Sequence, residues 1–142
     1  MASIRHMNET APPAEAARLN SEGMLALRAG SYAEAERLFV AATTHDTTSS
    51  ALWRNVATAR RAQGDDTGEM QALDAAISID RRDFMGWLRK AELHERTGEK
   101  AKALVAWSGV LQMAAHASDL SPDIAAALQK GQAFVAHATL EI

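Results

Sequence analysis

The sequence predicts an all-α chain that consists of three successive helix hairpins and one final covering helix. Two observations lead to this prediction. The 142 residues include 31 alanines and only three prolines, and no proline lies between Pro13 and Pro122. Alanine is the best helix former and proline the worst. In addition, Gly30, Gly64 and Gly98 are spaced by 34 residues, and a period of this length indicates stacked copies of one helical unit.

The N-terminal residues 1–13 are expected to be a flexible segment outside the fold. The internal pair His6-Met7 is typical of an expression scar that precedes a native start at Met7. We therefore expect one domain that spans residues 14–138.

The first repeat, residues 16–49, is predicted to form helices near 14–29 and 32–44. Gly30 lies where the first of these helices would end, because a left-handed residue after a helix costs glycine least. Ser31 and Glu34 match the S-x-x-E capping box, in which the serine hydroxyl accepts from the backbone N–H of the glutamate. This motif predicts the start of the second helix.

The second and third repeats are predicted to span residues 50–83 and 84–117. Ser49 and Asp83, which are 34 residues apart, are expected to cap their first helices, and Asp65 is expected to cap the second helix of repeat two. The helices are predicted near 50–63, 66–79, 84–97 and 99–116. A capping helix over 121–138 is indicated by Ser121-Pro122-Asp123, which supplies a cap, a proline at the first helical position and an acidic first turn.

Side-chain size repeats with the same period. The small residues Gly23, Ala57 and Ala91 would let the two helices of a hairpin approach closely. Three other series are formed by Leu19, Trp53 and Trp87, by Phe39, Leu73 and Trp107, and by Ala42, Ala76 and Val110. We expect Trp53 and Trp87 to fill the space between paired helices, so that truncating either to alanine would cost about 3–5 kcal/mol.

These positions resemble the tetratricopeptide repeat (TPR) family. The resemblance rests on the 34-residue period, the two tryptophans, the small-residue series and Gly30-Ser31-Tyr32, and it covers residues 16–117 with 121–138 as the usual extra helix. It implies a right-handed α-solenoid whose concave face binds a protein or peptide. The sequence departs from the family pattern at Glu69, which replaces an alanine, and at Thr47 and Arg81, which replace a proline.

A second resemblance concerns residues 80–84, 87–93 and 96–99. They are similar to the TPR region ahead of the catalytic domain in bacterial aspartyl/asparaginyl β-hydroxylase-like proteins. This resemblance implies a non-catalytic accessory module of a longer iron(II)/2-oxoglutarate enzyme. Two alternatives stay open, a free-standing adaptor that captures acidic C-terminal peptides and an enzyme fragment that contributes catalytic residues.

The composition and motifs argue against chemistry within this chain. There is no cysteine, and the net charge of -3 lacks the basic surplus of general nucleic-acid binders. No two of the five histidines are three or four residues apart, as a helical metal site would require. We therefore expect no catalytic site, metal or cofactor. The absence of a secretory signal and of a membrane-length apolar run favours the cytoplasm.

The TPR register implies which residues line the concave face. Arginine suits acidic ligands because its planar fork donates two parallel hydrogen bonds to a carboxylate. Asn55 and Arg89 fall on positions of the carboxylate clamp found in some TPR domains, although Met85 replaces a clamp lysine. In the alternative interpretation the arginines form ordinary solvated pairs with Glu92 and Glu95. The expected groove residues are Asn20, Met24, Arg28, Arg54, Asn55, Thr58, Arg61, Arg89, Glu92 and Arg96.

The last predicted helix suggests a further contact surface. One stripe of it carries apolar side chains, and Phe134 and Val135 on that stripe are expected to reach toward a following domain or a second copy. The alternative is a simple solubilising cap. Neither a nucleic acid nor a membrane is expected as a partner.

Overall fold

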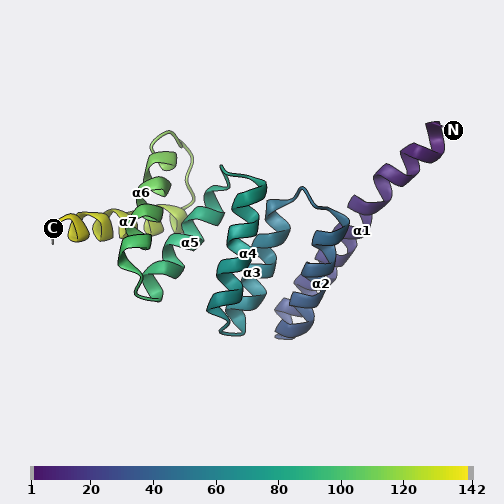
Figure 1. Ribbon diagram of the computed structural model, residues 1–142, viewed down its shortest axis with the longest axis horizontal. Helices are drawn as coiled ribbons and strands as arrows, with labels where there is room; N and C mark the ends of the chain where they lie inside the picture. Colours follow the sequence, from purple (N-terminus) through teal and green to yellow (C-terminus); the bar gives the residue numbers. More distant parts are fainter. Residues whose placement is uncertain (1, 141–142) are drawn as a thin grey trace. The chain divides into compact units, whose positions relative to one another are not determined.

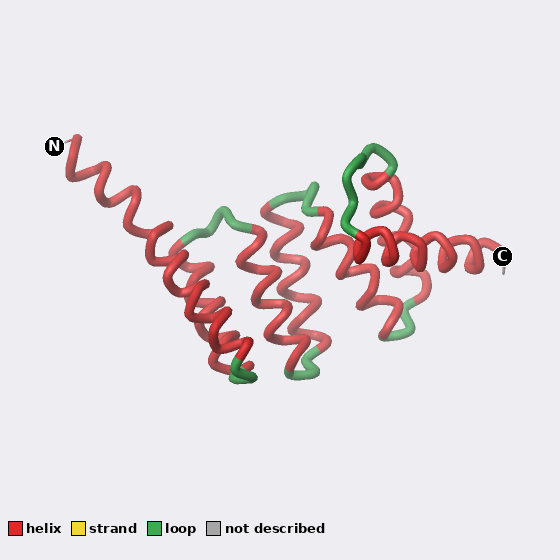
Figure 2. Tube along the Cα trace, turned by 180° about the vertical axis from the view of Figure 1, so that it is seen from behind, coloured by secondary structure: helices red, strands yellow, loops and turns green. Residues whose placement is uncertain are grey.

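A computed structural model describes residues 2–140, with side chains from Pro13 onward. Within this range the chain forms seven α-helices joined by loops, without strands (Figures 1 and 2). Their bounds are α1 Ala2–Arg28, α2 Tyr32–His45, α3 Ser50–Ala62, α4 Asp66–Ile79, α5 Phe84–Arg96, α6 Lys100–Ala114 and α7 Pro122–Leu140. The all-α prediction is confirmed, and α2 to α7 begin and end close to the predicted residues.

The first helix differs from the prediction. Helix α1 begins at Ala2 rather than near residue 14, so helical backbone continues through the segment that was expected to be flexible. The predicted start placed Pro12 and Pro13 ahead of the helix. The fixed φ of proline is compatible with a helical backbone, although each proline removes one N–H donor. The domain boundary at residue 14 stays a prediction.

The helices belong to two compact units, one that ends at Arg81 and one that begins at Arg82. In the first unit α1 pairs with α2 and α3 pairs with α4, while α2 also packs against α3. Ala16, Ala42 and Leu52 form a buried cluster from three of these helices. A Cβ atom on Gly23 would lie 2.5 Å from Cε1 of the Phe39 ring. Glycine is therefore what allows α1 to approach α2.

In the second unit α5 pairs with α6, and α7 packs against α6. The core is built around Trp107, whose side chain is only 1% exposed, together with Leu88, Ala91 and Leu128. Helix α7 approaches this ring closely, because a Cβ atom on Gly131 would lie 2.3 Å from Cε3 of Trp107. Phe134 and Val135 pack partly buried against the same core, so these two side chains cover their own unit.

Trp53 and Trp87 are less buried than the expectation that they fill the space between paired helices requires. Both are only half-buried, whereas the series Phe39, Leu73 and Trp107 is fully buried. The latter series fills the helix pairs, and Trp87 packs partly buried against the core of the second unit. The exposed side of Trp87 carries the ammonium group of Lys90, 5.3 Å from the ring centroid.

The predicted helix signals are confirmed with one exception. Gly30, Gly64 and Gly98 all have positive φ values of 75–80°. The side chains of Ser49, Asp65, Asp83 and Ser121 each accept a backbone N–H from the first turn of the helix that follows.

The capping box at Ser31 and Glu34 is the exception. Ser31 occupies the N-cap position, but its side chain accepts no hydrogen bond from α2. Glu34 instead accepts two hydrogen bonds from Arg37, at 2.6 and 2.9 Å. This bidentate pair holds the carboxylate along the helix, so that it does not fold back onto the N-cap.

Candidate peptide-binding site

In the first unit, Asn20 on α1 and Asn55 on α3 are in direct contact. The Asn55 Nδ2 group donates a hydrogen bond to Asn20 Oδ1 at 2.7 Å, and both side chains are half-buried. The first helices of two consecutive hairpins therefore present neighbouring polar side chains, as the predicted register requires. This bond uses one donor and one acceptor of the pair. The Asn20 NH₂ group and the Asn55 carbonyl oxygen retain capacity for a ligand.

Arginines lie on the same two helices. Arg28 is exposed in the last turn of α1, and Arg61 is exposed in the last turn of α3. Arg54 is half-buried one position before Asn55 and interacts with another group of the chain. Cations at the ends of α1 and α3 also complement the negative ends of the helix dipoles, so part of their role is stabilising.

Two further predicted groove residues differ in what they can offer a ligand. The hydroxyl of Thr58 donates to the backbone oxygen of Arg54 at 3.0 Å, so its hydrogen is used within α3. Met24 is half-buried beside Gly23 on α1 and can contribute an adaptable apolar contact.

The remaining predicted residues belong to the second unit. Arg89, Glu92 and Arg96 lie on α5 at spacings of three and four, which places them on one helix face. Arg89 and Arg96 each interact with other groups of the chain. A ligand would therefore share these arginines with intramolecular partners. Glu95 Oε2 accepts a hydrogen bond from the Trp107 indole at 3.0 Å, so this carboxylate faces α6.

A polar network that the sequence does not reveal joins α2 to α3. Glu36 accepts hydrogen bonds from Arg60 Nε at 3.2 Å and from Gln63 Nε2 at 2.7 Å, and Arg60 also donates to the backbone oxygen of Gly68 at 3.0 Å. The Arg60 side chain is only 17% exposed. This network fixes the hairpins that carry Asn20 and Asn55, so it supports the site without contacting a ligand.

The structure contains neither a metal site nor a helix suited to span a membrane among its described residues. Among the residues it describes, no group of three or more His, Asp or Glu side chains is placed to hold a metal ion. None of the described helices combines the length and apolarity needed to cross a membrane.

Comparison with known proteins supports the fold. No family model and no curated protein matches the chain. Among solved structures, the Yersinia enterocolitica type III secretion chaperone SycD in complex with a peptide of the translocator YopD is similar at 18% identity and a TM-score of 0.74, over 87% of this chain and 92% of that chain. The chain has a tetratricopeptide-like fold. The predicted helical repeat is thereby confirmed.

Two other similar structures are TPR domains by description. The Arabidopsis OM64 TPR domain shares 14% identity over 85% of this chain and 97% of its own, with a TM-score of 0.71. The first TPR of Spaghetti (RPAP3), bound to the HSP90 peptide SRMEEVD, shares 17% identity over 87% and 95%, with a TM-score of 0.72. None of these comparisons supports the resemblance to hydroxylase-like proteins.

Proposed function

We propose that this chain is a non-catalytic peptide-recognition module that binds an extended acidic peptide along α1 and α3. The observation that carries the proposal is the hydrogen bond between Asn20 and Asn55. The pair retains a donor and an acceptor, and a peptide group offers one acceptor and one donor in return. An extended ligand chain can therefore pair with it whatever its sequence.

The arginines supply the preference for acidic ligands. Arg28 and Arg61 are exposed on the same two helices as the asparagines, in a chain with a net charge of -3. A guanidinium group binds a carboxylate more strongly than it binds a neutral oxygen, because the hydrogen bonds are charge-assisted. The similar structures of SycD and RPAP3 hold peptides, and the RPAP3 ligand SRMEEVD contains three acidic residues.

The proposal is tested by fluorescence anisotropy with a labelled SRMEEVD peptide and a counterpart without acidic side chains, SRMQQVN. We expect the acidic peptide to bind more tightly and Asn55→Ala to weaken binding by about 1 kcal/mol, the net value of a neutral hydrogen bond. Arg61→Ala should weaken only the acidic peptide. Arg37→Ala is the matched control, because Arg37 is an exposed arginine of α2 paired with Glu34. Equal binding of both peptides by all variants would refute the proposal.

Arg89 of the second unit gives a separate test of acidic-ligand binding. If an acidic peptide contacts Arg89, Arg89→Ala should weaken the best acidic peptide by about 1.5–3 kcal/mol, as expected for the loss of a charged hydrogen bond. Unchanged affinity in a calorimetric titration, with an intact fold by circular dichroism, would show that Arg89 does not contact the peptide.

The accessory-module hypothesis is a finer proposal that rests on the sequence resemblance alone. It places this module ahead of a hydroxylase-like domain, where it would position a substrate or mediate self-association. The gene's reading frame tests it. A β-rich domain encoded beyond Ile142 supports it, and a stop codon at that point supports the free-standing adaptor.

A further inference from the structure

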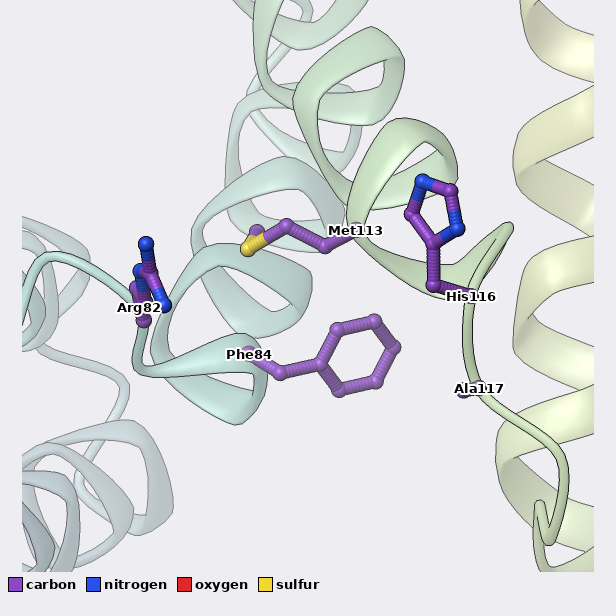
Figure 3. A pocket seen from close by; sticks show the side chains of 5 residues that line it. All are labelled: Arg82, Phe84, Met113, His116 and Ala117. Carbon is purple, nitrogen blue, oxygen red and sulfur yellow. The ribbon is translucent and has the colours of Figure 1, made fainter.

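The second unit contains a cavity that lies apart from the proposed peptide site. It has a volume of about 420 Å³ and is lined by Arg82, Phe84, Met113, His116 and Ala117. Its walls come from the start of α5, the end of α6 and the segment that follows α6. Figure 3 shows the Phe84 ring and the Met113 thioether between Arg82 on one side and His116 on the other. None of these residues belongs to α1 or α3, which carry the asparagine pair.

The cavity borders the connection between α6 and α7, which contributes His116 and Ala117 to its lining. Within the first unit, four residues, 46–49, join α2 to α3, whereas residues 115–121 separate α6 from α7. The longer connection leaves the helix at Ala114 and makes a detour before Pro122. Phe84 contacts the core of the unit on one side and the cavity on the other.

The chemistry of the walls selects a class of ligand. Phe84 and Met113 supply an apolar surface, and methionine adapts its shape to different apolar bodies. Arg82 supplies a permanent positive charge, which a ligand would share with another group of the chain. His116, on the other side, supplies a hydrogen-bonding imidazole. None of the five lining residues is acidic. The volume lies within the range of small-ligand pockets, about 300–1,000 Å³.

From these features we infer that the cavity binds a carboxylate with an apolar body, with the body on Phe84 and Met113 and the carboxylate on Arg82. A free aromatic acid and the C-terminal residue of a peptide that ends in an apolar side chain share this chemistry. The inference concerns a second site and holds whether or not a peptide binds along α1 and α3.

The test is a titration followed by NMR of methyl-labelled methionine, with the Met113 methyl signal as the reporter. The probes are 3-phenylpropionate, its neutral amide, the peptide Ala-Ala-Phe and that peptide's C-terminal amide. We expect the free acids to shift the Met113 signal and the amides to bind about fivefold more weakly, as for loss of an exposed ion pair. Tighter binding of Ala-Ala-Phe identifies a peptide terminus as the ligand, and tighter binding of 3-phenylpropionate identifies a small acid.

Substitutions test whether the probes bind in this cavity or elsewhere on the protein. Arg82→Gln should weaken the free acids about fivefold, while Arg81→Gln, the adjacent arginine outside the lining, should leave binding unchanged. Ala117→Trp should fill the cavity and abolish binding, and Ala117 is exposed, so the fold should tolerate it. Asn55→Ala should have no effect. Equal shifts with acids and amides, no shift at all, or full binding to Ala117→Trp would each overturn the inference.

Discussion

Replacing Gly131 with alanine tests how closely α7 packs on the core of the second unit. In the interior of an exposed helix this change stabilises a protein by about 1 kcal/mol, because glycine loses more backbone entropy on folding. At Gly131 the added methyl would lie 2.3, 2.6 and 2.8 Å from three carbons of the Trp107 ring. Carbon atoms in favourable contact are about 3.5–4.0 Å apart. The ring, at 1% exposure, has little space to retreat.

The expected magnitude follows from these two opposing effects. Overpacking a core by a methyl group costs about 1–3 kcal/mol, which equals or exceeds the gain in helix propensity. Gly131→Ala should therefore lower the free energy of unfolding by about 0–2 kcal/mol. Gly109→Ala is the matched control, since it also lies within a helix but its added methyl meets nothing within 4 Å. That variant should raise the free energy of unfolding by about 1 kcal/mol.

Urea unfolding, followed by far-UV circular dichroism and tryptophan emission, measures both variants. Adding Trp107→Leu to Gly131→Ala removes the obstructing ring, and a double-mutant cycle should then show a coupling of about 1 kcal/mol or more. If Gly131→Ala stabilises the protein as much as Gly109→Ala does, the close approach of α7 to Trp107 is refuted.

Three other changes are expected to have measurable effects on stability. Trp53→Ala should cost about 2 kcal/mol in urea unfolding, below the range for a fully buried tryptophan, and a loss of 4 kcal/mol or more would contradict its half-buried position. Glu36→Gln should cost about 1.5 kcal/mol, because it removes the charge from the hydrogen bonds with Arg60, and an unchanged midpoint would show that this network contributes nothing. The hydrogen bond from Arg18 lowers the pKa of Glu15 in the folded protein. The stability that this pair provides is therefore fully present above the pKa of the carboxyl group in the unfolded chain. It is lost as the pH falls through the lower pKa of the folded protein. The melting temperature of Arg18→Ala should therefore fall less between pH 6 and pH 3 than that of the unmodified protein. If both proteins show the same dependence on pH, the pair of Arg18 and Glu15 does not contribute to stability.

The repeat positions were predictable because they depend on the local geometry of one hairpin. Gly30 ends a helix and Asp65 begins one through contacts within a few residues, and these signals can be read directly from the sequence. The burial of Phe39 also follows from the period, since a large side chain that faces the small residue Gly23 packs into the space between the two helices. Local rules fail where two of them compete, as at Glu34, which pairs with a neighbouring arginine instead of completing the cap.

The features that escaped prediction depend on residues far apart in sequence. Glu36 and Arg60 are 24 residues apart and share no motif, so their contact emerges only when α2 packs on α3. The cavity beside Phe84 depends on the path of a loop without regular structure. The period correctly indicated that Asn20 and Asn55 lie on neighbouring first helices, but the hydrogen bond between them requires side-chain geometry.

The packing of α7 on Trp107 also limits how this array can be lengthened or shortened. A protein truncated after α6 would expose a broad indole surface to water and would be prone to self-association through it. An additional hairpin in place of α7 could approach as closely as α7 does only with glycine at the point of contact, since the Cβ of alanine would lie 2.3 Å from the ring there. The contact between Gly131 and Trp107 thus restricts how closely a different helix could pack on α6 at this position.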